Sequence, residues 1–135
     1  MDAELALAAF RETRLAHTIH VAPNGQEALD YVFGRAGYAD RDTYPIPNLI
    51  LLDLKMPGID GLEVLRQIKS TPLLRRLPVV ILTTSKEEGD RALCYDNGAN
   101  SYVVKPDSFE GFLDVVREID GYWLSLNVEP PGVIG

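Results

Sequence analysis

The sequence predicts an α/β domain in which helices cover both faces of a parallel sheet. Short apolar runs alternate with helical segments along the chain, and this alternation is typical of parallel sheets. The apolar runs are continuous, as in strands that are buried on both faces. A chain of 135 residues is long enough for one such domain and leaves no room for a second.

The first part of the chain predicts a helix, a strand and a helix in turn. Residues 2–14 favour a helix because they are rich in Ala, Leu and Glu, with apolar residues on one face. Residues 18–22 predict a short strand, and the Pro-Asn-Gly sequence at 23–25 predicts the turn after it. A second, short helix is expected over residues 26–33, with Gly34 as its stop.

The middle of the chain begins with a polar loop over residues 35–47, and loops of this length are often functional. Residues 48–52 are continuously apolar, which predicts a strand that is buried on both faces. A loop over residues 56–61 and a helix over residues 62–70 follow this strand. The order of strand, loop and helix is again that of a parallel sheet.

The second half predicts two more strands, each followed by a helix. Residues 78–83 favour a buried strand, and residues 86–97 favour a helix that closes at Gly98. Residues 101–104 predict the second of these two strands, which is short. From residue 109 the apolar residues keep helical spacing to about residue 126.

These elements suggest a simple domain organisation. Residues 1–126 are expected to form the domain, and residues 127–135 an extended C-terminal arm that contains Pro130 and Pro131.

The composition excludes several classes of protein. The 20 acidic and 13 basic residues give a formal charge of −7, the wrong sign for binding nucleic acid or an anionic membrane. No apolar run approaches the roughly 20 residues of a membrane helix, and the start lacks the basic region of a secretory signal. A single cysteine, Cys94, excludes an intrachain disulfide and a cysteine-based zinc cluster. We therefore expect a cytoplasmic protein.

Polar residues of different chemistry end three successive expected strands. Asp53 follows the first, Thr83 and Thr84 end the second, and Lys105 follows the third. Parallel packing should bring these strand ends to one edge of the sheet, where ligands bind in such folds. A carboxylate, a hydroxyl and an ammonium group are what the transfer of a phosphoryl group onto a carboxylate requires.

The motifs around these residues resemble a known family. The stretch Asp-Leu-Lys-Met-Pro-Gly-Ile-Asp-Gly runs from Asp53 to Gly61, with Thr83 and then Lys105-Pro106 following at wide spacing. As a spaced set, they resemble the receiver domain of two-component response regulators, over residues 2 to about 126. The resemblance implies a flavodoxin-like receiver fold. The long loop and the end of the chain resemble stand-alone receivers that partner phytochrome-type histidine kinases.

The resemblance implies a role for each of the main site residues. Asp53 would accept the phosphoryl group from a kinase phosphohistidine, and Thr83 would hydrogen-bond that group. Lys105 would pair with a phosphoryl oxygen, and Tyr102 would be the switch that changes rotamer when Thr83 moves. Each role has a simpler alternative. Asp53 could be a polar cap of its strand, Thr83 an ordinary β-branched strand residue, and Tyr102 a half-buried tyrosine without a switch role.

Other residues would shape the site. Pro57 and Gly61 would form the loop after the phosphoacceptor, and Thr84 would lie at the mouth and tune hydrolysis. Pro106 resembles the family's cis-proline, which would aim the preceding lysine inward. The charged run over residues 86–91 is expected to be the solvated start of a helix.

One departure from the family concerns magnesium. Receivers begin with a strand, central in the order 2-1-3-4-5, that ends in an acidic pair holding Mg²⁺, whereas this sequence opens in the first helix. Mg²⁺ would then have the Asp53 carboxylate, the Lys55 carbonyl and water, so weak binding is expected.

Three explanations of the absent strand stay open. The sequence begins late, the protein is truncated and exchanges elements with a second copy, or residues 18–22 pair with residues 48–52 in a smaller sheet. The first leaves the chemistry intact, and the other two predict impaired phosphorylation.

The expected function is that of a single-domain response regulator in phosphorelay signal transduction, with a sensor histidine kinase as its partner. Catalysis would be limited to its own phosphorylation and dephosphorylation. The alternative is a pseudo-receiver, a binding or dimerisation module that acts without phosphorylation. An aspartate-nucleophile phosphohydrolase would need a second aspartate where Lys55 stands. A flavodoxin-like FMN carrier would need a loop richer in Ser, Thr and Gly than any here.

The end of the last helix suggests a homodimer. Tyr122, Trp123 and Leu126 lie beyond what a compact core needs, and aromatic residues are enriched in interfaces. The alternative is that Trp123 only caps the core.

Overall fold

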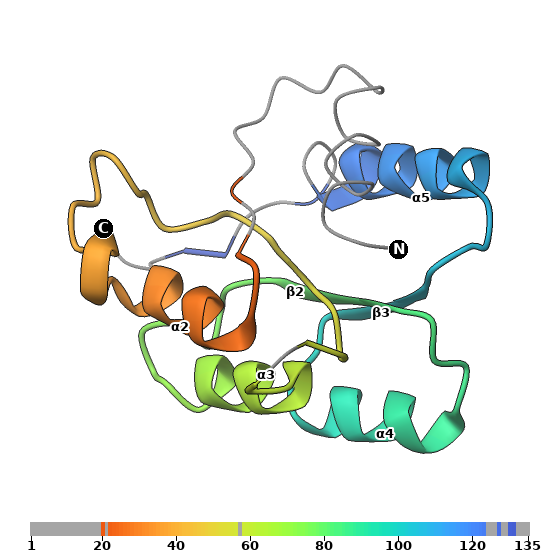
Figure 1. Ribbon diagram of the computed structural model, residues 1–135, viewed down its shortest axis with the longest axis horizontal. Coiled ribbons are helices and arrows are strands. Elements are labelled where there is room, and N and C mark those ends of the chain that lie inside the picture. Colours follow the sequence, from red (N-terminus) through yellow and green to blue (C-terminus); the bar gives the residue numbers. More distant parts are fainter. Residues whose placement is uncertain (1–19, 21, 57, 124–126, 128–129, 132–135) are drawn as a thin grey trace. The chain divides into compact units, whose positions relative to one another are not determined.

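A computed structural model of the chain describes residues 20, 22–56, 58–123, 127, 130 and 131 (Figure 1). They belong to two compact units, each described here by itself. The sheet unit consists of residues 22–104 and 129–135, and the α5 unit of residues 1–21 and 105–128. The helix expected over residues 2–14 lies outside the described residues. So does the strand expected over residues 18–22, apart from His20 and Ala22, which belong to no strand.

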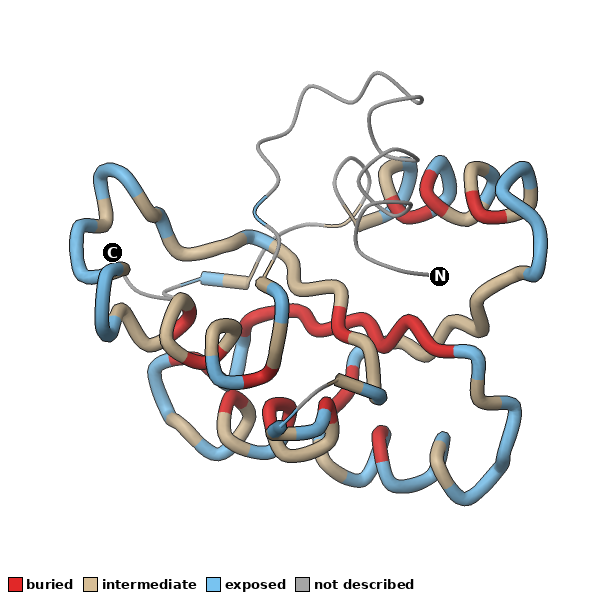
Figure 2. The backbone as a smooth tube through the Cα atoms, in the orientation of Figure 1, coloured by how far each residue is buried: buried red, intermediate tan, exposed pale blue. Residues whose placement is uncertain are grey.

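The sheet unit contains the three expected parallel strands. They are β1 (Ile50–Leu52), β2 (Val79–Thr83) and β3 (Ser101–Val104), in the order β1-β2-β3. Leu52 pairs with Ile81, and Thr83 pairs with Val104. All five residues of β2 are buried, and Figure 2 shows this strand as a continuous buried segment. The predicted α/β class with a parallel sheet is therefore confirmed.

The burial expected for β1 is wrong in part. Only Leu52 of its three residues is fully buried, while Ile50 and Leu51 are half-buried. The physical reason is its position, because β1 has β2 as its one neighbour among the described residues. A strand at that position is covered less completely than a central strand.

Three helices of the sheet unit pack against the strands. They are α2 (Gly25–Phe33), α3 (Gly61–Lys69) and α4 (Glu88–Asp96). Asn24 caps α2 by accepting a hydrogen bond from the Glu27 N–H, and Asp60 caps α3 in the same way through Glu63. Gly34 ends α2 with a φ of 68°, as its position in the sequence predicts.

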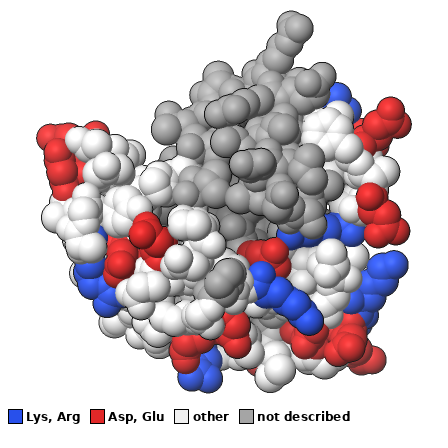
Figure 3. Space-filling model, viewed as in Figure 1, with Lys and Arg blue, Asp and Glu red and all other residues white. Residues whose placement is uncertain are grey.

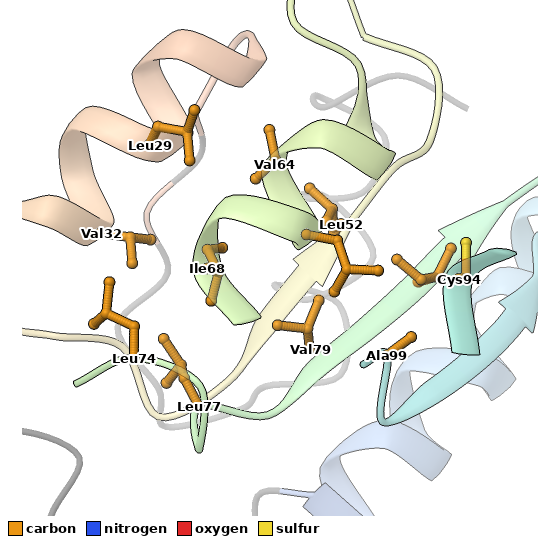
Figure 4. Packing of buried hydrophobic residues seen from close by; sticks show 12 residues of the cluster. Leu29, Val32, Leu52, Val64, Ile68, Leu74, Leu77, Val79, Cys94 and Ala99 are labelled. Carbon is orange, nitrogen blue, oxygen red and sulfur yellow. The ribbon is translucent and has the colours of Figure 1, made fainter. Parts of the chain in front are cut away.

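The core of the sheet unit lies between these helices and the strands. Side chains from α2, α3 and α4 meet those of β1 and β2 in one hydrophobic cluster, which Figure 4 shows. Val64, Leu65 and Ile68 supply the buried face of α3, whereas Cys94 is the one fully buried residue of α4. Helix α4 is therefore anchored by much less buried surface than α3.

The α5 unit contains α5 (Phe109–Gly121), capped by the Ser108 hydroxyl. Phe112, Val116 and Ile119 are buried, which confirms the helical spacing expected from the sequence. The regular helix ends at Gly121, earlier than expected, and residues 122–123 continue as a wider helical turn. Residues 124–126 lie outside the described part of the chain.

The predicted loop over residues 35–47 contains a short 3₁₀ turn, η1 (Ala36–Tyr38), and folds back on α2. The Arg41 guanidinium donates hydrogen bonds to the carbonyls of Tyr31, Val32 and Tyr44, at 2.8, 2.7 and 3.1 Å. Two of these carbonyls belong to the last turn of α2, where carbonyl groups lack hydrogen-bond partners within the helix. Arg41 thus closes the helix and shapes the loop at once.

Three tyrosines hold the same loop together. The rings of Tyr31, Tyr38 and Tyr44 lie with centroids 5.0–6.1 Å apart, in tilted and edge-on geometry. The Tyr38 hydroxyl donates to Glu27 at 2.6 Å, and the Tyr31 hydroxyl donates to the Pro45 carbonyl at 2.9 Å. The hydrogen bond to Glu27 is the main cause that raises the pKa of Tyr38 to about 12.

The distribution of charged side chains and the length of the helices were compared with what the composition predicts. Figure 3 shows acidic and basic side chains interspersed over the visible face of the described residues. Within this part of the chain, no helix is both long and apolar enough to cross a membrane.

The tyrosine cluster predicts a loss of stability in alkali. The folded protein keeps the Tyr38 proton up to a pKa of about 12, whereas the unfolded chain loses it near the ordinary value of 10.0. The unfolded state therefore binds fewer protons between pH 10 and 12, and the free energy of unfolding should fall as pH rises through this window. Melting temperatures of Tyr38→Phe should fall less over this range than those of the parent. Tyr95→Phe, at an exposed tyrosine of α4, is the control, and an equal fall in all three proteins would contradict the prediction.

Candidate functional site

The candidate site lies where two neighbouring parallel strands end. Asp53 follows β1 directly, and Thr83 is the last residue of β2. Because Leu52 pairs with Ile81, the two strands end at the same edge of the sheet. Asp53 is half-buried, and one carboxylate oxygen accepts the Lys55 N–H at 3.1 Å. The Thr83 side chain is completely buried.

The loop after Asp53 is held against two glycines. A Cβ atom at Gly61 would overlap the Asp53 carbonyl oxygen, and one at Gly25 would overlap the Ile59 carbonyl oxygen. The Gly61 N–H also donates to the Leu54 carbonyl at 3.0 Å. Close packing of backbone on backbone thus fixes where the loop leaves the sheet and where α3 begins. Pro57, the other residue expected to shape this loop, lies outside the described residues.

Ser85 connects the ends of β2 and β3 with α4. Its N–H donates to the Thr83 hydroxyl oxygen at 3.2 Å, and its carbonyl accepts the Tyr102 hydroxyl at 3.0 Å. Its own hydroxyl donates to the Asp90 carboxylate at 2.5 Å and accepts the Glu87 N–H at 3.3 Å. Thr84, expected at the mouth of the site, is exposed. The two residues predicted as switch partners therefore both bond to Ser85.

Lys105 and Pro106 belong to the α5 unit, although they directly follow β3 in the chain. The convergence of Lys105 with Asp53 and Thr83 therefore stays a prediction. The expected cis bond before Pro106 is wrong, since none of the described peptide bonds is cis. The trans form is the more stable isomer of an X–Pro bond by about 0.5–1 kcal/mol.

The described residues do not provide a full metal site by themselves. No group of three or more His, Cys, Asp or Glu side chains among them is arranged to hold a metal ion. Asp53 contributes one carboxylate, and Lys55 is exposed and has a backbone carbonyl to offer. Mg²⁺ prefers six oxygen ligands, so the weak binding expected from the sequence stays a prediction.

Two functional features were missed by the sequence analysis. The run over residues 86–91 is expected to be solvated, yet its Asp90 accepts the Ser85 hydroxyl. No capping box indicates this contact, because Ser85 and Asp90 are five residues apart and that motif needs a spacing of three. The contact of Gly25 with Ile59 joins parts that are distant in sequence, and no local pattern indicates it.

Cys94 is buried, and burial raises the pKa of its thiol, as expected for a core residue.

Two of the three expected interface residues lie in the described part of the chain. Tyr122 is 47% exposed, and its ring meets that of Trp123 edge-on, with centroids 5.0 Å apart. Leu126, the third of these residues, lies outside the described part of the chain.

Comparisons with known proteins agree on one family. Residues 3–117 match the model of the response regulator receiver domain. The chain is 41% identical over 128 residues to the probable methanogenesis regulatory protein FilR2 of Methanothrix harundinacea, a match that covers 95% of this chain and 80% of the relative. It is 35% identical over 123 residues to the response regulator Rcp1 of Synechocystis, with 91% and 82% covered.

Solved structures give the same result. The phosphorylated cyanobacterial phytochrome response regulator RcpA matches with a TM-score of 0.87 and 37% identity, covering 94% of this chain and 89% of that one. The Mn²⁺-bound form of Rcp1 matches with a TM-score of 0.84 and 34% identity, covering 95% and 90%.

The close approach at Gly61 predicts a large effect of one methyl group. Gly61→Ala would force the backbone at Asp53 to shift and should lower the free energy of unfolding by about 1–3 kcal/mol. Gly89→Ala is the matched control, because position 89 lies in α4 with open space around it and alanine favours a helix. Urea unfolding measures both variants. Equal stability of Gly61→Ala and the parent would show that the loop tolerates the added methyl group.

Proposed function

Because the chain belongs to the response regulator receiver domain family, we propose that Asp53 is the residue at which it accepts a phosphoryl group in phosphorelay signal transduction. The observation that supports this choice is the position of Asp53 beside the end of β2, at the carboxyl edge of a parallel sheet. Ligand chemistry in such sheets takes place at this edge.

The transfer is a substitution at phosphorus. A carboxylate oxygen of Asp53 attacks the phosphorus of a phosphohistidine, an O–P bond forms, and the N–P bond breaks as the electron pair returns to the imidazole. The Lys55 N–H already holds the carboxylate at one oxygen, which orients the other for attack. The Thr83 hydroxyl would then donate to an oxygen of the phosphoryl group, and Lys105 would neutralise its charge.

Receiver domains are signalling proteins and not classical enzymes. We propose that phosphorylation and later hydrolysis of the acyl phosphate are catalysed by the receiver's own residues, as the resemblance implies. Thr84 is exposed beside Thr83 and would affect the access of water to the acyl phosphate.

Receivers use a divalent metal ion, and the solved form of Rcp1 cited above is Mn²⁺-bound. In this chain the Asp53 carboxylate and the Lys55 carbonyl are the described groups that would bind Mg²⁺. Because this set is small, we propose that Mg²⁺ binds weakly, and no step of the transfer is assigned to it.

The proposed partner is a sensor histidine kinase of the phytochrome type. The support is the similarity to RcpA, described as a phytochrome response regulator, over nearly the full length of both chains. We also propose that residues 1–126 act as the receiver and residues 127–135 as its C-terminal arm. The described contacts of this arm include a hydrogen bond of 2.8 Å from Arg76 to the Pro131 carbonyl.

We further propose that the chain forms a homodimer through the end of α5. Tyr122 presents an exposed ring supported by Trp123, and paired aromatic side chains are typical of interface centres. An exchange of elements between the two copies would be one form of this dimer. The competing function is a receiver that binds its partners without being phosphorylated.

The assignment of Asp53 predicts a specific covalent product. Incubation with acetyl phosphate and Mg²⁺ should add one phosphoryl group to the parent and none to Asp53→Asn, as measured by intact mass. Asp96→Asn, at an exposed carboxylate of α4, should be labelled like the parent. If Mg²⁺ binds weakly, labelling should still rise with Mg²⁺ at concentrations of about 1 mM and above.

The outcome also separates the two functions. No label on folded parent protein would favour the phosphorylation-independent binding module, and equal labelling of Asp53→Asn would move the acceptor to another residue.

The proposed interface predicts a weaker dimer when its aromatic centre is removed. Trp123→Ala should raise the dimer dissociation constant about tenfold or more, because buried tryptophans dominate interface energies. Sedimentation measures the change, with Leu73→Ala as a control at an exposed leucine of the sheet unit. A dissociation constant equal to that of the parent would place Trp123 outside the interface.

A further inference from the structure

Ser85 is the meeting point of the two residues that are expected to move during signalling. Thr83 and Tyr102 come from neighbouring strands, and each has its hydroxyl bonded to the backbone of Ser85. Any rotation of the Thr83 side chain that turns its oxygen away from the Ser85 N–H breaks this contact. Any shift of the Ser85 carbonyl changes the partner of the Tyr102 hydroxyl. The position of Ser85 therefore decides which arrangement both residues adopt.

The Asp90 carboxylate fixes that position. The Ser85 hydroxyl donates to it at 2.5 Å, and a bond of this length to a charged acceptor belongs to the strong class of hydrogen bonds. Asp90 lies in the first turn of α4, where the helix dipole stabilises a negative charge. Asp90 is half-buried, which reduces the competition of water for its carboxylate.

Helix α4 has few other attachments to the core. Cys94 is its one fully buried residue, while Leu93 and Tyr95 are 49% exposed. The hydrogen bond between Asp90 and Ser85 is therefore a considerable part of what ties the start of α4 to the end of β2. A helix with little buried surface, whose start is tied to the end of a strand by one strong hydrogen bond, has the properties of an element with two possible positions.

We propose that Asp90 is a positioning residue that restrains the receiver. Its carboxylate holds Ser85, and Ser85 holds Thr83 and Tyr102 in the arrangement of this structure. The proposal rests on the proposed function, because the restraint opposes the movement of Thr83 toward a phosphoryl group on Asp53. Phosphorylation must then release or displace the loop over residues 84–87, and α4 moves with it.

The hydrogen bond between Ser85 and Asp90 is called the latch from here on. If it restrains the receiver, phosphorylation should be faster when it is removed. With acetyl phosphate and Mg²⁺, Asp90→Ala and Ser85→Ala should each be labelled about fivefold faster than the parent, equivalent to about 1 kcal/mol. Because both substitutions remove the same bond, the double variant should be no faster than either single variant. Asp90→Asn retains a neutral acceptor and should fall between the parent and Asp90→Ala.

The controls separate restraint from general damage. Asp96→Asn removes a charge from the other end of α4 and should be labelled at the parent's rate. Thermal unfolding reports any loss of stability, and a purely structural role of Asp90 would lower the melting temperature without accelerating labelling. Labelling of Asp90→Ala at the parent's rate or more slowly would overturn the proposal and leave the assignment of Asp53 intact.

A second measurement tests the latch without phosphorylation. Amide hydrogen exchange over residues 84–90 should be faster in Asp90→Ala and Ser85→Ala than in the parent, because the Ser85 and Glu87 amides donate within this network. Equal exchange would overturn the latch. If the parent takes no label at all, the proposed function fails, and the exchange experiment alone decides whether Asp90 restrains the loop.

Discussion

The parallel pairing of β2 with a strand on each side is the constraint on which the described site depends. All five residues of β2 are buried, so polar chemistry is possible only where the strand ends. That end is Thr83, whose hydroxyl oxygen accepts the Ser85 N–H of the next loop. The register with β1 places Asp53 at the same edge. A slip of one residue would turn the Thr83 hydroxyl to the opposite face of the sheet and separate the two groups.

Much of this arrangement could be predicted from local patterns. The continuous apolar run predicted the full burial of β2, Gly34 marked the end of α2, and the order of strands and helices predicted that Asp53 and Thr83 lie at one edge of the sheet. The burial of β1 could not be predicted, because it depends on how many neighbours a strand acquires. The contact between Gly25 and Ile59 could not be predicted either, since it depends on how a loop and a helix meet in space.

The charged start of α4 also contains a contact that the local sequence pattern does not predict. A run of Lys, Glu, Asp and Arg is usually a solvated surface, and most of these residues are exposed here. The exception is Asp90, which accepts a hydroxyl from the loop that precedes the helix. The two sides of the Asp53 edge are thus built differently. In the loop after Asp53, backbone atoms pack directly against Gly61, so the loop has little room to move. After Thr83, the structure is held by a few hydrogen bonds that Ser85 makes.

The loop over residues 35–47 has a consequence for how the chain can change. Arg41 and the tyrosine cluster attach this loop to α2, the helix that it follows, and a side chain at Gly37 would meet open space. The contacts described for this loop are therefore made within the loop and with α2, before the chain reaches β1. Evolution, or protein engineering, can lengthen this loop or insert a new recognition segment into it while the edge of the sheet that carries Asp53 keeps its geometry.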